Sequence, residues 1–256
     1  MKIRFTFLGT GTSQGIPVIG CRCKVCTSTD IKDQRLRTAA LVSIGDINIA
    51  IDTGPDFRMQ MLRAGVETLE AVLITHEHND HIAGLDDVRP FNFSQGKDMP
   101  VYTLPRVAAA LRSRFQYIFD DNPYPGAPQI ALYPIEAGTL LHIGEIPVLP
   151  LAVQHGEMPI LGFRIGALAY ITDAKYLSKA TIESIQEVPV LILNALHHRS
   201  HHSHMDLQEA LQAITLIRPG KVFLTHISHH MGLHEEVNRT LPEGVSLAYD
   251  GLKLEC

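Results

Sequence analysis

The stretch Thr75-His76-Glu77-His78-Asn79-Asp80-His81 follows directly on a short apolar run at residues 70–74. That run is partly β-branched and bounded by polar residues, so it predicts a buried strand. The side chains after it then lie on a loop at a sheet edge, where His76 and His78 can face one ion and Asp80 and His81 a second. Imidazole and carboxylate ligands suit zinc, manganese or iron(II) without a thiolate. The stretch therefore predicts a metal site.

Three later strand-like runs each end at one ligand-type residue. Residues 146–153 lead to His155, residues 169–172 to Asp173, and residues 221–225 to His226. Any one of these residues alone is more typical of a hydrogen-bonded loop position. A catalytic dinuclear site needs roughly three protein ligands per metal and an open position. Together the three residues predict that the missing ligands lie on the same rim.

A second cluster of metal-type side chains lies near the N-terminus, in Cys21-Arg22-Cys23-Lys24-Val25-Cys26. Close cysteine spacing is typical of a structural zinc or a disulfide. The only other cysteine is Cys256, so the three thiols cannot all pair with one another. A zinc site needs a fourth ligand, for which His229 is the candidate. Reduced thiols without a metal are the alternative.

The strand followed by H-x-H-x-D-H, with the later His, Asp and His, resembles the metallo-β-lactamase superfamily over essentially the whole chain. The resemblance, together with alternating strand and helix signals, implies an α/β fold: a four-layer αβ/βα sandwich with a small N-terminal zinc knuckle. It implies that one metal is bound by His76, His78, His155 and Asp173, and the other by Asp80, His81, His226 and the shared Asp173. Asp80 counts as catalytic as well as a ligand.

The cysteine cluster and the segment Thr225-His226-Ile227-Ser228-His229 resemble one branch of that superfamily. The branch contains the cyclic-phosphate phosphodiesterase of the phosphonate carbon–phosphorus lyase pathway. The segments at residues 8–15 and 249–251 are also similar to it. The resemblance implies a structural zinc bound by Cys21, Cys23, Cys26 and His229.

The same resemblance implies that His204 is the general acid. His204 precedes Met205-Asp206-Leu207, as in the local pattern of the family, and Asp206 with Glu209 predicts a capping box that opens a helix over residues 207–217. A fixed helix start would hold the preceding histidine in place. Four neighbouring histidines compete for the role: His197, His198, His201 and His202.

Length and composition favour one domain over residues 1–256. The chain is 45% hydrophobic and contains no flexible linker or low-complexity tract. The absence of a secretory leader and of a membrane-length apolar run, together with reduced cysteines, predicts a cytoplasmic protein. The formal net charge of −5 weighs against a transfer-RNA processing role, for which a basic stripe is typical.

We therefore expect a dinuclear-metal phosphodiesterase that hydrolyses small, cyclic phosphodiesters such as phosphoribosyl cyclic phosphate. Its cofactors would be two divalent ions, manganese or zinc, and one structural zinc. Its partner would be a small-molecule phosphodiester rather than a membrane or a nucleic acid, with a homodimer as the candidate assembly.

Three alternatives belong to other classes. An RNA 3′-processing nuclease should carry a basic arm, and no such arm is found. A thioester hydrolase of the glyoxalase II type needs a helical domain after His226, where too few residues follow. A non-catalytic cofactor-biosynthesis relative should have lost some of the ligands that are all present here.

Overall fold

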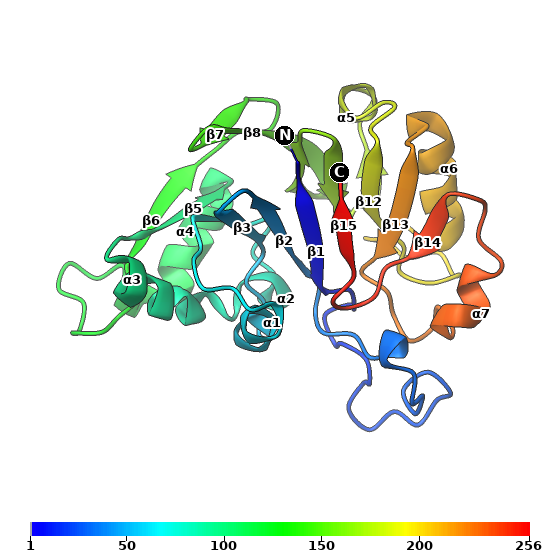
Figure 1. Ribbon diagram of the computed structural model, residues 1–256, viewed down its shortest axis with the longest axis horizontal. Helices are drawn as coiled ribbons and strands as arrows, with labels where there is room; N and C mark the ends of the chain where they lie inside the picture. The colour runs from blue at the N-terminus through cyan, green and yellow to red at the C-terminus, as the bar shows by residue number, and fades with distance from the viewer. Residues whose placement is uncertain (1) are drawn as a thin grey trace.

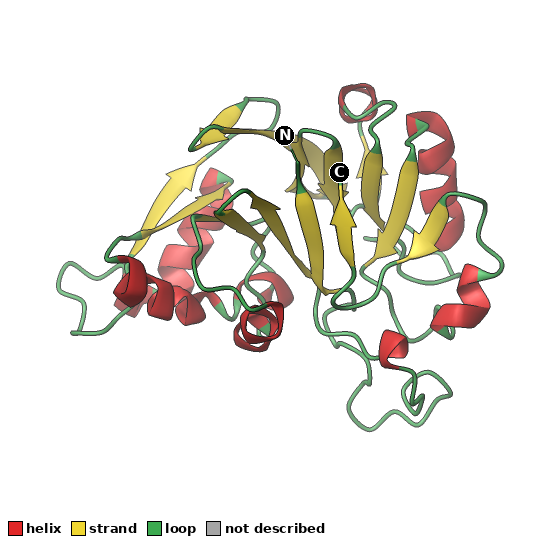
Figure 2. Ribbon diagram, viewed as in Figure 1, coloured by secondary structure: helices red, strands yellow, loops and turns green. Residues whose placement is uncertain are grey.

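Two β-sheets lie face to face in the computed structural model, with helices on their outer faces (Figures 1 and 2). The structure describes residues 2–256, so Met1, which belongs to the expected domain over residues 1–256, lies outside the described residues. The four-layer α/β sandwich predicted from the sequence is confirmed. The single-domain assignment stays a prediction.

The first sheet has the order β15-β1-β2-β3-β4-β5-β6. Its strands are β1 (Arg4–Gly9), β2 (Ala39–Ile44), β3 (Ile47–Ile51), β4 (Ala71–Leu73), β5 (Met99–Thr103), β6 (Ile130–Pro134) and β15 (Lys253–Glu255). Strands β3 to β6 run parallel, whereas β15, β1, β2 and β3 are antiparallel neighbours.

The second sheet has the order β11-β8-β9-β10-β12-β13-β14, and β7 pairs with β8 at its side. Its strands are β7 (Leu141–Ile143), β8 (Ile146–His155), β9 (Met158–Ile165), β10 (Leu168–Ile171), β11 (Tyr176–Leu177), β12 (Val190–Asn194), β13 (Lys221–Thr225) and β14 (Val245–Leu247). Strands β10, β12, β13 and β14 are parallel neighbours, so their carboxyl ends meet at one edge.

Helices cover the outer face of each sheet (Figure 1). The first sheet carries α1 (Phe57–Ala64), α2 (Asn79–Ile82), α3 (Arg89–Gln95) and α4 (Pro105–Arg114), and the second α5 (Lys179–Ser184), α6 (Leu207–Ile217) and α7 (His234–Asn238). Three short 3-10 turns are η1 (Ile31–Asp33), η2 (Leu85–Val88) and η3 (Gln116–Ile118). No helix within residues 2–256 combines the length and apolarity needed to cross a bilayer.

Side-chain alternation along the strands divides the core into layers. In β3, Ile49 and Ile51 point between the two sheets, where they pack with Phe163 and Tyr170 of the second sheet. Ala50 points the other way and packs under the helices. Because successive residues of a strand face opposite sides, a strand buried on both faces has an unbroken apolar sequence. This explains why the ligand-bearing strands appear as continuous apolar runs.

Each predicted ligand-bearing run is a strand, with bounds that differ slightly from the sequence. The run at residues 70–74 contains β4 (Ala71–Leu73), residues 169–172 correspond to β10 (Leu168–Ile171), and residues 221–225 are β13. The run at residues 146–153 extends further, because β8 continues to His155 through pairing with β9. His155 is therefore the last residue of a strand rather than part of a loop.

Candidate functional site

The loop after β4 brings the first imidazoles together. His76 is buried and its Nε2 lies 3.1 Å from Nδ1 of the exposed His78. His155, at the end of β8, completes a group whose ligand atoms lie within 4.8 Å of one another. Nδ1 of His155 lies 2.8 Å from the carbonyl oxygen of Asp173 and 2.9 Å from that of Ser203. Since carbonyls only accept, Nδ1 carries the proton and Nε2 is free to bind an ion.

A second group forms around His81. Its Nδ1 donates to Oδ2 of the buried Asp52 at 2.7 Å, so Nε2 is the ring nitrogen that faces the site. That Nε2 lies 3.3 Å from a carboxylate oxygen of Asp80 and 3.4 Å from one of Asp173, yet it is buried without a hydrogen-bond partner. Burial lowers the pKa of His81, but Asp173, Asp52 and Asp80 outweigh it and raise that pKa well above its usual value. The ring is therefore an imidazolium whose charge balances these carboxylates, and a divalent ion bound to Nε2 would supply that balance in its place. The donor set fits such an ion.

The structure brings all seven predicted active-site ligands to one rim, but the distances between their ligand atoms differ. Three sets have ligand atoms within 4.8 Å of one another: His76, His78 and His155; His76, His81 and Asp173; and His155, Asp173 and His204. Asp80 and His226 border these sets, and Nδ1 of His226 lies 3.1 Å from Oδ2 of Asp173. Asp173 belongs to two of the sets, as a bridging carboxylate would.

Asp52 is a site residue that the sequence analysis missed. It follows β3 directly, which is the same strand-end position that singles out Asp173 and His226. Its φ of 67° lies in the left-handed region, as do those of Asp173 (57°) and His226 (55°). Non-glycine residues in this region cost about 1–3 kcal/mol each and persist where the surroundings over-determine them. The strand-end position was the available signal for Asp52.

Burial and charge act against each other on the ionisable groups of the site. Burial raises the pKa of Asp173, but His226 and His81 outweigh it and hold that pKa well below its usual value. Burial lowers the pKa of His76 well below its usual value, and the neighbouring His81 lowers it further. Asp173 is therefore a carboxylate and His76 a neutral imidazole. These are the forms that bind a metal.

His204 contacts the site with one ring nitrogen and residues of its own loop with the other. Its Nε2 lies 3.0 Å from Oδ1 of Asp173, and its Nδ1 lies 3.0 Å from Oγ of Ser203 and 3.3 Å from Nδ1 of His201. Burial lowers the pKa of His204 to about 4, and the hydrogen bond to Asp173 opposes that shift. The same distances would also suit His204 as a metal ligand, because it shares a set with His155 and Asp173.

The predicted capping box and the helix over residues 207–217 are confirmed. The Glu209 amide donates to Asp206 and the Asp206 amide donates to Glu209, both at 2.9 Å. Lys175, two residues after Asp173, pairs with the Glu209 carboxylate at 2.6 Å. The Met205 amide also donates to the carbonyl of Ala174 at 2.7 Å. The start of α6 is thus fastened to the segment that carries Asp173.

A cavity of about 560 Å³ opens beside the first group of histidines. It is lined by His78, His155, Gly156, Glu157, Met158, His202 and Ser203. The lining mixes imidazole, hydroxyl and carboxylate groups with a methionine. Its size suits a small molecule rather than a folded partner.

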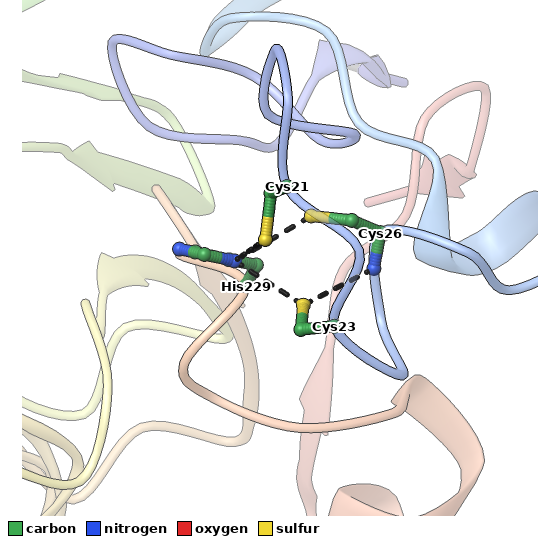
Figure 3. A group of neighbouring side chains, drawn as sticks. All are labelled: Cys21, Cys23, Cys26 and His229. Carbon is green, nitrogen blue, oxygen red and sulfur yellow. Dashed lines mark hydrogen bonds between the residues drawn. The ribbon is translucent and has the colours of Figure 1, made fainter.

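The three N-terminal cysteines surround His229 (Figure 3). The sulfur atoms of Cys21, Cys23 and Cys26 lie 3.4, 3.3 and 3.4 Å from Nδ1 of His229. The Cys26 amide donates to the Cys23 sulfur, and this hydrogen bond lowers the pKa of Cys23 to about 6. A backbone N–H directed at a sulfur favours the thiolate, which is the metal-binding form. The four side chains fit the Cys3His set of a structural zinc.

Comparisons with known proteins agree with this architecture. The model of the β-lactamase superfamily domain matches residues 47–227. A crystal structure described as a new diphosphatase from the PhnP family has a TM-score of 0.94 at 39% identity, covering 100% of this chain and 98% of that one. Zinc-bound PqqB from Methylobacterium extorquens has a TM-score of 0.80 at 18% identity, covering 99% of this chain and 100% of that one, and so shares the fold.

A curated relative carries a different name. The octanoyltransferase of Porphyromonas gingivalis is 41% identical over 98% of this chain, but the match covers only 51% of that protein. The chain thus spans about half the length of this relative, whose name describes the whole protein. The matched family domain and the convergent His and Asp side chains identify the chain itself: it belongs to the metallo-β-lactamase superfamily and is similar to a solved member of the PhnP family.

Proposed function

We propose that this chain is a dinuclear-metal phosphodiesterase that acts on small phosphodiesters, including cyclic ones such as phosphoribosyl cyclic phosphate. The observation that carries the proposal is the position of His204, whose Nε2 lies 3.0 Å from the Asp173 carboxylate that two of the ligand sets share. A hydrolase that cleaves an alkyl phosphodiester needs a proton donor beside its metals, and His204 is placed to be that donor.

The metals would be held by the residues described above. His76, His78 and His155 with Asp173 would bind one ion, and Asp80, His81 and His226 with the shared Asp173 would bind the other. Two divalent ions there, manganese or zinc, would supply Lewis-acid activation of water and neutralise charge on the phosphate. Asp52 would hold His81 in the tautomer that leaves its Nε2 unprotonated.

The protein's part in the reaction is to orient the ions and to deliver a proton. With its Nδ1 against Ser203 and its Nε2 aimed at the site, His204 would give the Nε2 proton to the leaving oxygen. Because burial lowers its pKa to about 4, the protonated form depends on nearby negative charge. A bound phosphodiester brings such a charge and favours the imidazolium.

A diphosphate ester is the second candidate substrate. It is favoured by the solved neighbour described as a diphosphatase, which is 39% identical over the whole chain. A phosphoanhydride presents the same non-bridging oxygens to the metals. However, its leaving phosphate needs a proton less than an alkoxide does, so the two candidates differ in their dependence on His204.

We also propose a structural zinc, a cytoplasmic location and a homodimeric assembly. The zinc would be bound by Cys21, Cys23, Cys26 and His229. Octanoyl transfer is not proposed, because half of the protein that bears that name lies outside the matched region.

A substrate screen tests the function. Purified protein supplemented with manganese or zinc would be assayed against bis(p-nitrophenyl) phosphate, 2′,3′-cyclic nucleotides, ribose cyclic phosphates and a nucleoside diphosphate. We expect phosphomonoester products from the diesters and no turnover by Asp80→Ala. Release of inorganic phosphate from the diphosphate alone would favour the second candidate. Inactivity on every phosphorus substrate would refute both.

A further inference from the structure

The peptide group that follows Asp173 is held at both of its polar atoms. Its carbonyl oxygen accepts from Nδ1 of His155 at 2.8 Å, and its N–H, which belongs to Ala174, donates to Oδ1 of Asn194 at 2.7 Å. Because the peptide group is planar, the rotation ψ of Asp173 sets the direction of both atoms, and the two hydrogen bonds fix that rotation. Asp173 needs such support, since its φ of 57° lies in a region that aspartate seldom adopts.

The next peptide group is held by the same side chain. Nδ2 of Asn194 donates to the Ala174 carbonyl oxygen at 3.0 Å, and the Met205 amide donates to the same oxygen at 2.7 Å. The N–H of this group, which belongs to Lys175, donates to the Gln154 carbonyl at 2.7 Å. One amide side chain thus binds both the N–H and the C=O of Ala174, as the backbone of a neighbouring strand would.

Asn194 lies where the second sheet brings two ligand-bearing strands together. It is the last residue of β12, which pairs in parallel with β10 on one side and with β13 on the other. Those two neighbours lead to Asp173 and His226. Asn194 is fully buried, where an amide is costly unless its polar atoms find partners. It finds them on Ala174, so this buried side chain serves the turn that carries Asp173.

We propose that Asn194 is a positioning residue for the metal centre, an inference that rests on the proposed dinuclear function. It acts through Ala174, whose peptide groups direct the Asp173 carboxylate that both proposed ions share. Movement of this carboxylate would change the separation of the two ions, which is about 3.5–4 Å in sites of this kind. Outer partners that orient metal ligands typically alter metal affinity or activity by about 10–100-fold.

A second buried asparagine makes the same kind of two-point contact and belongs to none of the ligand sets. Oδ1 of Asn92, on α3, accepts from the Gln129 amide at 3.0 Å, and its Nδ2 donates to the Gln129 carbonyl at 2.9 Å. Replacing either asparagine with alanine therefore removes comparable hydrogen bonds to buried backbone. A purely structural role for Asn194 predicts the same outcome at both positions, which makes Asn92→Ala the matched control.

Electron paramagnetic resonance of the manganese-loaded protein tests the role without an activity assay. Two Mn²⁺ ions bridged by one carboxylate are exchange-coupled, and their spectrum differs from that of isolated ions. We expect the coupled spectrum in the wild type and in Asn92→Ala, but a spectrum dominated by isolated Mn²⁺ in Asn194→Ala at the same manganese concentration. The weaker of the two manganese dissociation constants should rise about 10–100-fold in Asn194→Ala. Asn194→Ser, whose hydroxyl can hold a water against Ala174, is the milder second variant and should show an intermediate change.

The outcomes for wild type and variants separate this inference from the proposed function. Both alanine variants should lose thermal stability, because each leaves buried backbone groups without partners. Wild-type spectra and manganese affinity in the Asn194 variants, the same changes in Asn92→Ala, or loss of the fold in both Asn194 variants would show that Asn194 is structural only. Absence of the coupled spectrum in the wild type would instead refute the dinuclear proposal, and the role of Asn194 with it.

Discussion

Oδ1 of Asp173 lies 3.0 Å from Nε2 of His204, while Oδ2 of the same carboxylate lies 3.4 Å from Nε2 of His81. One side chain at the end of β10 therefore meets a proposed metal ligand with one oxygen and the proposed acid with the other. Its φ of 57° shows that the backbone there is held in a conformation that aspartate seldom adopts. A shift in this residue would disturb both the ions and the proton donor.

Replacing Asp80 with alanine should empty one active-site position. Its carboxylate lies 3.3 Å from Nε2 of His81, and no other described carboxylate besides Asp173 lies so close to that nitrogen. We expect the exchangeable metal content to fall from about two ions to about one per chain, the tightly held zinc to remain, and turnover to fall more than about 100-fold. Elemental analysis before and after mild chelation measures the metals.

Asp46→Ala, at an exposed turn, is the control. Wild-type metal content below one ion per chain after supplementation would refute the dinuclear proposal.

The Asp52→Asn variant tests a residue that touches no proposed ion. Asp52 accepts the Nδ1 proton of His81 and also hydrogen bonds from the amide and hydroxyl of Thr75. Asparagine can present its N–H₂ group to His81 and so favour the wrong tautomer. Loss of such outer partners typically costs about 10–100-fold in metal affinity or activity. We expect a weaker second ion and lower kcat at fixed metal concentration, with partial recovery at high manganese. Wild-type metal affinity in the variant would contradict this role.

Much of the fold and the site was predictable, because neighbouring residues in the sequence determine these strands and this helix. The apolar runs that end at Asp173 and His226 are strands, since a strand buried on both faces has no polar alternation. The helix at residues 207–217 was predictable from its capping box, which acts within four residues. These signals depend on neighbours along the chain and not on distant packing.

What the sequence could not supply depends on contacts between distant segments. Asp52 forms a hydrogen bond with His81, which lies 29 residues further along the chain, and no residue next to either one indicates this pairing. The choice of His204 among five histidines rested on a resemblance, whereas its distance to Asp173 arises from packing of α6 on the second sheet. The extension of β8 to His155 likewise depends on pairing with β9.

Changing Cys23 to serine should destabilise the protein and remove its tightly held zinc. The four side chains of the cluster join the N-terminal loop to the segment after β13 (Figure 3), so the ion would link distant parts of the chain. Structural zinc contributes directly to folding free energy. We expect zinc content to fall by one ion per chain and the melting temperature to drop. Cys256→Ser, outside the cluster, is the matched control. Wild-type zinc content and melting temperature in Cys23→Ser would show that the cysteines are ordinary thiols.

We predict that His234, which lies outside the metal site, makes the stability of the protein depend on pH. It is buried, accepts from the Arg35 guanidinium at 3.2 Å, and burial lowers its pKa to about 4. The unfolded chain, with a histidine pKa of about 6.5, binds the proton more readily, so stability is present above pH 6.5 and is lost as the pH falls toward 4. We expect His234→Gln to remove about 1–2 kcal/mol of the loss between pH 7 and pH 5, measured by urea unfolding. The exposed His142→Gln should keep the wild-type slope, and equal slopes for all three proteins would contradict the prediction.

Removing His204 should matter in proportion to how poor the leaving group is. If its Nε2 proton goes to the leaving oxygen, His204→Ala should lower kcat on a ribose cyclic phosphate by about 10²–10⁴-fold. With p-nitrophenolate, which departs without a proton, the loss should be far smaller. Metal content separates the acid from a ligand: an acid leaves it unchanged, whereas the alternative set with His155 and Asp173 predicts a loss. His198→Ala, an exposed position on the same loop outside the cavity that His155 lines, controls for the loss of a nearby imidazole. An equal rate loss on both substrates would refute the acid role, and His201, whose Nδ1 lies 3.3 Å from that of His204, would be the next residue to replace.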